Sequence, residues 1–106
     1  MWVRHMAVFL IAAAVLTHAP TVLADTGTIY HCTVKNEADV TIYMDAPGKT
    51  INFEQKGVMS PEARVQSGAF QAAFAGGRFR FVPSPMSHQG TITIVRTGTT
   101  RSGQCE

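Results

Sequence analysis

The chain has 106 residues, of which 9 are Lys or Arg and 7 are Asp or Glu. This near-neutral balance argues against nucleic acid as a partner, because nucleic-acid-binding domains need a basic face. The sequence also lacks the cluster of Lys and Arg that would hold a protein on an anionic membrane surface.

The first 24 residues have the three parts of a secretory signal peptide: a short basic start (Met1–His5), an apolar run (Met6–Leu16), and short side chains before a cleavage point (Val22–Ala24). The alternative is a transmembrane anchor, but the apolar run is shorter than the roughly 20 residues that cross a bilayer. We expect cleavage after Ala24, a periplasmic or secreted protein, and no stable membrane anchor after signal removal. Residues 25–106 then form a single domain.

The two cysteines lie near the two ends of this domain, at Cys32 and Cys105. A domain of this size has a marginal hydrophobic core and gains from a covalent link, and export supplies the oxidising compartment in which one forms. We expect a Cys32–Cys105 disulfide, which would stabilise the fold by about 4 kcal/mol on the chain-entropy account. The alternative is a pair of free or intermolecular thiols.

In the first half of the domain, successive side chains alternate between apolar and polar types with a period of two, and this pattern predicts β-strands. It runs through Thr28–Val34, Val40–Asp45 and Thr50–Glu54. Between the last two, Pro47 and Gly48 suit the central positions of a type II turn, which predicts a hairpin.

The middle of the chain is less regular. Lys56–Pro61 reads as a connection, and Ala63–Ser67 as a strand. Ala69–Ala75 is rich in alanine and fits a helix, but Phe70 and Phe74 would share one face of either a helix or a strand. The glycines on both sides favour a strand.

Alternation returns in the last third of the chain, in the strand-like segments Arg78–Val82, Thr91–Thr97 and Arg101–Cys105. The total is seven or eight short strands joined by short turns. This count predicts an all-β fold, a small antiparallel meander barrel closed by one disulfide, or a flattened sandwich of the same strands.

An enzyme is not expected. The exported part has only two histidines, His31 and His88, and the disulfide would consume both cysteines, so no nucleophile–base–orienting triad is evident. It also lacks a glycine-rich phosphate loop and zinc-type ligand spacing, so we expect no cofactor and no metal.

Copper is a weaker alternative. Met86 and His88 are two residues apart in a proline-stiffened loop, and His31, Met44 and Met59 are candidates for further ligands. The simpler interpretation is that the methionines fill gaps in the core and that the histidine is exposed to solvent.

Ser67-Gly68 and Arg78-Phe79-Arg80 are the remaining features that could bind a partner. The plain interpretation is a turn that ends a strand and the solvent face of another strand. In a functional interpretation, a rigid loop tip with a hydroxyl near a projecting cation enters a cleft lined with carboxylates.

Taken together, these features resemble the bacterial periplasmic and membrane-bound inhibitors of c-type lysozyme. The resemblance spans most of residues 28–105 and lies in five features: the exported small domain, the opening Tyr30-His31-Cys32, the hairpin that reaches Gly48-Lys49, the Ser67-Gly68 pair, and the terminal Gly103-Gln104-Cys105. It implies an eight-stranded antiparallel barrel.

The resemblance also implies a function: inhibition of c-type lysozyme by insertion of the Ser67 loop into the active-site cleft. The implied partner-binding residues are Ser67, Gly68, Phe70 and Arg80. The sequence departs from the family at position 71, where Gln71 stands in place of a tyrosine next to Phe70, and Arg80 replaces the family's lysine as the candidate cation. The alternative is a protein-binding or envelope accessory module on the same fold, without lysozyme inhibition.

Overall fold

The computed structural model describes residues 26–106, so the predicted signal peptide lies outside the described residues. The described part consists of β-strands and turns, and contains no helix that could span a membrane. The strands are β1 (Thr26–Val34), β2 (Val40–Asp45), β3 (Thr50–Gln55), β4 (Val58–Met59), β5 (Ala63–Gln66), β6 (Ala69–Phe74), β7 (Gly77–Pro83), β8 (Gly90–Arg96) and β9 (Thr99–Cys105).

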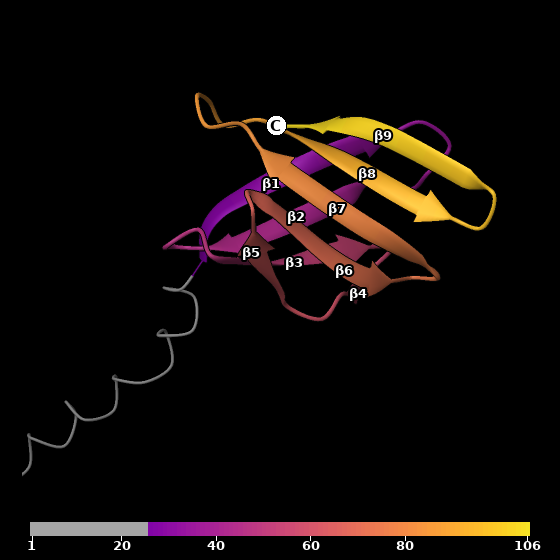
Figure 1. Cartoon of the computed structure of the whole chain (residues 1–106), viewed down its shortest axis with the longest axis horizontal. Coiled ribbons are helices and arrows are strands. Elements are labelled where there is room, and N and C mark those ends of the chain that lie inside the picture. The colour runs from indigo at the N-terminus through magenta and orange to yellow at the C-terminus, as the bar shows by residue number, and fades with distance from the viewer. Residues whose placement is uncertain (1–25) are drawn as a thin grey trace, which may run out of the picture.

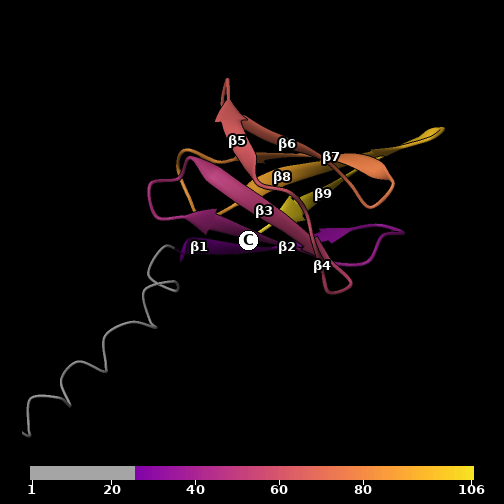
Figure 2. The ribbon, with the colours of Figure 1, turned by 90° about the horizontal axis from the view of Figure 1, so that it is seen from below.

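The strands form one sheet in the order β2-β1-β9-β8-β7-β6-β5-β3-β4, and an additional pairing of β2 with β3 closes it into a barrel. Every pairing is antiparallel, and Figures 1 and 2 show the strands wrapping around a common interior. Eight strands make the barrel and β4 is an extra strand paired only with β3. The prediction of an all-β antiparallel meander barrel is therefore confirmed.

The interior is filled by the side chains that alternate inward. Phenylalanines dominate it: the Phe79 ring centroid lies 5.5 Å from that of Phe53 and 5.0 Å from that of Phe74, in edge-to-face arrangements. The Tyr30 ring lies 4.8 Å from the Phe81 ring. The side chains on the inward faces of β1, β2 and β7 include buried Tyr30, Cys32, Val34, Val40, Ile42, Met44, Phe79 and Phe81.

The disulfide links the first and last strands. Cys32 of β1 lies directly opposite Cys105 of β9, and the two sulfur atoms are bonded. Next to it, Gly103 allows β9 to approach β1 closely, because a Cβ at this position would stand 2.1 Å from the carbonyl oxygen of Thr33. The predicted Cys32–Cys105 pairing is confirmed.

The ambiguous segment from Ala69 is a strand, β6, as favoured above. Two local predictions were wrong. Lys56–Pro61 is not only a connection, since Val58–Met59 pairs with β3 and the buried Ser60 Oγ accepts a hydrogen bond from the Phe53 N–H. The turn after β2 is not type II at Pro47-Gly48: Gly48 N–H bonds Asp45 C=O and so occupies the last turn position.

Removing the disulfide should cost much of the stability of this domain. We expect the double substitution Cys32→Ala and Cys105→Ala to lower the free energy of unfolding by about 4 kcal/mol, because the bond spans 73 residues and restricts the unfolded chain. Urea unfolding followed by circular dichroism measures this. The reduced wild-type protein is the control and should show a similar loss; a loss below about 1 kcal/mol would contradict the expectation.

Candidate functional site

The predicted Ser67-Gly68 tip is a two-residue turn between β5 and β6. Gln66 pairs with Ala69, so only Ser67 and Gly68 form the loop, and both have positive φ, 52° and 80°. Positive φ at both central residues is the signature of the type I′ turn, which matches the natural twist of a hairpin. The turn is exposed, and Figure 2 shows the β5–β6 hairpin (Ala63–Phe74) extending beyond the neighbouring strands.

The short pairing of β5 explains why this hairpin projects. Ala63 and Arg64 pair with β3, whereas Val65 and Gln66 pair with β6. The first half of β5 therefore belongs to the barrel wall and the second half to the hairpin. Val65 remains 38% exposed although it faces the same side as the buried Phe70, because the hairpin has passed the rim of the barrel.

A neighbouring loop supports the base of the hairpin. The Val65 N–H donates to the carbonyl oxygen of Lys49, at 3.0 Å. The Asp45 carboxylate in turn accepts hydrogen bonds from the backbone N–H groups of Lys49, at 2.8 Å, and Thr50, at 3.1 Å. Asp45 thus fixes the loop on which the hairpin rests.

The hydrogen bonds to the Asp45 carboxyl group also affect its pKa. Partial burial raises its pKa, but backbone hydrogen bonds from Thr50, Lys49 and Gly48 favour the ionised form and together bring the pKa below its ordinary value. The carboxylate therefore remains ionised, and able to accept these bonds, to a lower pH than an ordinary aspartate.

Lys49 is an exposed cation close to the tip that was not among the predicted binding residues. Its carbonyl contacts Val65, and Ser67 lies two residues further along, roughly 7 Å in an extended strand. The sequence contained one signal for it, the position of Lys49 at the end of a hairpin loop.

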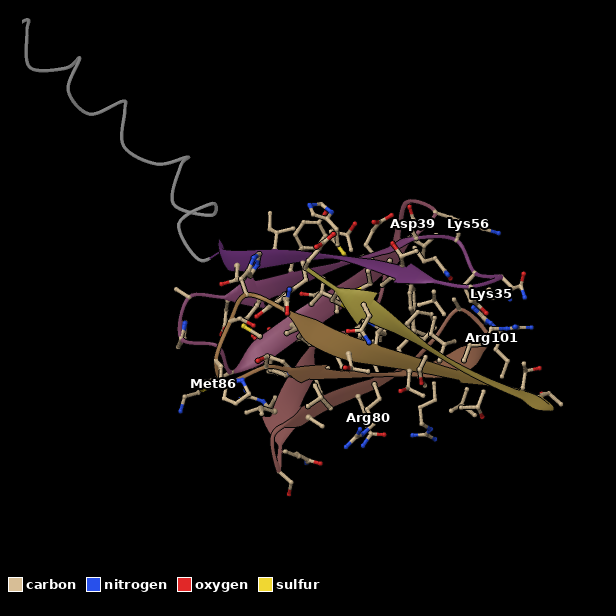
Figure 3. The ribbon with its side chains drawn as sticks, turned by 90° about the horizontal axis from the view of Figure 1, so that it is seen from above. Lys35, Asp39, Lys56, Arg80, Met86 and Arg101 are labelled. Carbon is tan, nitrogen blue, oxygen red and sulfur yellow. A yellow bond between two sulfur atoms is a disulfide. The ribbon has the colours of Figure 1, made fainter. Side chains whose placement is uncertain are left out.

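The other predicted binding residues lie elsewhere. Phe70 is 1% exposed, and its ring lies 6.3 Å from that of Phe81, so it belongs to the core and offers no surface to a partner. Arg80 is exposed on β7 opposite Gln71, which is four residues, or about 13 Å of strand, from Ser67. Figure 3 shows Arg80 projecting away from the barrel. The structure thus keeps Ser67 and Gly68 together at the tip and separates Arg80 from them.

A second polar cluster occupies one end of the barrel, beside a cavity of about 470 Å³ lined by Asn36, Glu37, Ala38, Gln55, Lys56, Val58, Ala75 and Arg96. The Glu37 carboxylate receives two hydrogen bonds of 2.8 Å from the Arg96 guanidinium and one of 3.2 Å from Gln55 Nε2. Arg96 also donates to the carbonyl of Ala75, and its guanidinium lies 5.7 Å from the centre of the Phe79 ring.

This cluster joins distant parts of the chain. The hydrogen bonds from Arg96 lower the pKa of Glu37 to about 2, although burial opposes the shift. Because the two charges satisfy one another, the pair ties the turn after β1 to the end of β8 and leaves little binding capacity for a ligand. We interpret the Glu37–Arg96 pair as an interaction that stabilises the fold.

The candidate copper ligands lie in different parts of the structure. Met86 is 88% exposed in the loop between β7 and β8, while Met44 is buried. His88 Nε2 is 3.1 Å from the Ile29 carbonyl oxygen, and the His88 ring lies 4.7 Å from that of Tyr30, so the histidine fastens its loop to the barrel. Among residues 26–106 no group of three or more His, Cys, Asp or Glu side chains could hold a metal ion.

No protein family, curated protein or solved structure matches this chain.

The Glu37–Arg96 pair predicts how stability depends on pH. Glu37 has a folded pKa of about 2 against an ordinary value of 4.5, so its contribution is complete above pH 4.5 and is lost as the pH falls towards 2. We expect Glu37→Gln to lower the free energy of unfolding at pH 7 by about 2 kcal/mol and to flatten its pH dependence in this window. Urea unfolding at a series of pH values measures both.

The control for this prediction is Glu62→Gln, which alters an exposed carboxylate that is not part of the Glu37–Arg96 pair. It should leave both the stability at pH 7 and the steepness between pH 4.5 and 2 nearly unchanged. Equal effects of the two substitutions would show that Glu37 is not the group responsible.

Proposed function

We propose that this protein inhibits a c-type lysozyme by inserting the tip of the β5–β6 hairpin into the active-site cleft. The observation that carries the proposal is the exposed two-residue turn at Ser67-Gly68, which projects past the barrel rim on a hairpin fixed at its base. A binding loop that is already ordered loses little conformational freedom on association, and this favours tight binding.

The chemistry of the tip suits such a cleft. A lysozyme holds one carboxyl group protonated and a second one ionised on either side of the glycosidic bond. A serine hydroxyl both donates and accepts, so Ser67 is able to donate to the ionised group and accept from the protonated one. Gly68 has no side chain, and the turn is therefore narrow enough to reach between the two groups.

The cation in this proposal is Lys49. It lies on the loop that supports the hairpin, and its flexible side chain is long enough to reach towards the tip. A lysine beside a carboxylate-lined cleft gains from charge-assisted hydrogen bonding where water is partly excluded. Arg80 has no part in this contact, since it lies some four residues from Ser67 along the sheet.

The experiment is a cell-wall lysis assay with c-type lysozyme and the oxidised exported form of the protein. We expect inhibition at submicromolar concentration. Loss of a hydrogen bond to a charged group is worth about 1.5–3 kcal/mol, so Ser67→Ala should weaken inhibition roughly 10- to 100-fold, and Ser87→Ala, at an exposed serine of another loop, should have no effect. Absence of inhibition at tens of micromolar from the folded protein would refute the proposal and leave the accessory-module alternative.

Ser67→Gly separates binding from stability. Serine is unfavourable at a φ of 52°, whereas glycine adopts this conformation freely. We expect this substitution to raise the free energy of unfolding by a few tenths of a kcal/mol, or to leave it unchanged, while it weakens inhibition as much as Ser67→Ala does. A variant that is destabilised would contradict the turn assignment, and one that inhibits fully would contradict the role of the hydroxyl.

The role of Lys49 is tested by Lys49→Gln, with Lys35→Gln as its matched control in the turn after β1. The first should weaken inhibition about 10-fold through the loss of a charged hydrogen bond, and the second should not. Equal inhibition constants for the two variants would remove Lys49 from the binding site.

A further inference from the structure

The acidic and basic residues are divided along the chain in an unusual way. Residues 63–105 contain no Asp or Glu, and their charged side chains are five arginines at positions 64, 78, 80, 96 and 101. All three lysines lie before this segment, intermixed with acidic residues. Because residues 63–105 form strands β5 to β9, an acid-free segment makes up one side of the barrel wall.

Two of these arginines are free on the outer surface. Arg96 is engaged by Glu37, and Arg101 lies near enough to contribute to the low pKa of that carboxyl group. Arg78 and Arg80, by contrast, are exposed on β7, between the inward-facing phenylalanines, and neither makes an ion pair within residues 26–106. Arg64, on β5, has Glu62 two residues away and lies at the edge of this region.

The sheet register places polar groups on both sides of these two arginines. Arg80 lies opposite Gln71 of β6 and Thr93 of β8, and Thr93 lies opposite Ser102 of β9. Arg78 lies opposite Ala73 and Val95, and Val95 lies opposite Thr100. We call this surface the arginine face, and it consists of Gln71, Ala73, Arg78, Arg80, Thr93, Val95, Thr100 and Ser102. Its two rows each run about 14 Å across four strands.

We propose that the arginine face binds an anionic polysaccharide. Two guanidinium groups that start about 7 Å apart on one strand face no competing acid on their own or neighbouring strands, and guanidinium groups recognise carboxylate and phosphate oxygens in pairs of hydrogen bonds. The hydroxyl and amide groups beside Arg80 are suited to sugar hydroxyls. A chain of several charged sugars is long enough to contact both rows.

Other partners suit this face less well. It has no aromatic side chain, because the described phenylalanines are directed inward, and Val95 is its only large apolar residue. Protein interfaces usually depend on aromatic anchors, and single-stranded nucleic acid on aromatic stacking. A lipid surface gains only about 1 kcal/mol from each basic residue, so two arginines on a convex barrel hold it weakly.

This surface is separate from the lysozyme-inhibition site. Arg80 lies opposite Gln71, which is four residues from Ser67, and Figure 3 shows Arg80 on the outer side of the barrel. The proposal therefore holds or fails independently of lysozyme inhibition.

The test is calorimetric titration of the purified protein with polygalacturonate, a linear polymer with one carboxylate on each sugar, at low and at physiological salt. We expect binding at low salt that weakens as salt is added, and no binding to neutral dextran. The double variant Arg78→Gln/Arg80→Gln should bind at least 10-fold more weakly. The matched control Lys35→Gln/Lys56→Gln removes the same charge from the turns after β1 and β3, outside the arginine face, and should change affinity less than 2-fold.

Both double variants alter exposed side chains, and an unchanged urea midpoint verifies that each is folded. Three results would overturn the proposal: no binding of polygalacturonate at low salt, equal losses in the two double variants, or tighter binding of anionic phospholipid vesicles or a single-stranded oligonucleotide than of the polymer. The last result would assign the arginine face to a lipid or nucleic-acid partner instead.

Discussion

The pairing of the first strand, β1, with the last strand, β9, is the constraint on which the rest of this structure depends. Cys32 and Cys105 lie opposite one another in this pairing and are covalently bonded, and Gly103 lets the two strands approach closely. A short sheet of this kind has exposed edges that invite association with other chains. Closure of the sheet into a barrel removes those edges and encloses the phenylalanines of the core.

Closure also determines where the barrel has freedom to form a binding surface. The wall is continuous on the side of β6, β7, β8 and β9, whereas on the other side β5 leaves β3 after two paired residues. The hairpin that follows therefore projects instead of lying in the wall. Its support comes from Asp45 and Lys49, a loop that is near in space although it is some twenty residues earlier in the chain.

The two proposed surfaces would bind their partners through different interactions. The β5–β6 hairpin would bind through the shape of its ordered two-residue tip, through one hydroxyl group, and through a nearby cation. The arginine face offers two cations on the outer surface of β7, which are left free because residues 63–105 contain no acidic residue. Where an arginine does meet an acid, at Arg96 and Glu37, the pair is used within the protein to fasten two turns together.

Much of the fold was determined by the sequence alone. Alternation of apolar and polar side chains in Val40–Asp45 and Arg78–Val82 indicated strands, and only one pairing was open to two cysteines in one chain. Strand alternation is a local property, and two cysteines allow only one pairing within a chain, so neither inference depends on the tertiary arrangement. The helix-or-strand ambiguity of the segment from Ala69 came from alanine, whose local preference for helix was overridden by pairing with β7.

The candidate sites were decided only in the folded structure. The sequence identified Ser67 and Gly68 as a turn, but the resemblance to an inhibitor family grouped Phe70 and Arg80 with them as expected binding residues. Burial placed Phe70 in the core, and strand length carried Arg80 away from the tip. Lys49 was placed near the tip by the hydrogen bond between its carbonyl oxygen and the N–H of Val65, which is distant in sequence. Contacts of this kind depend on register and on where a strand leaves the wall, and short sequence patterns do not encode either.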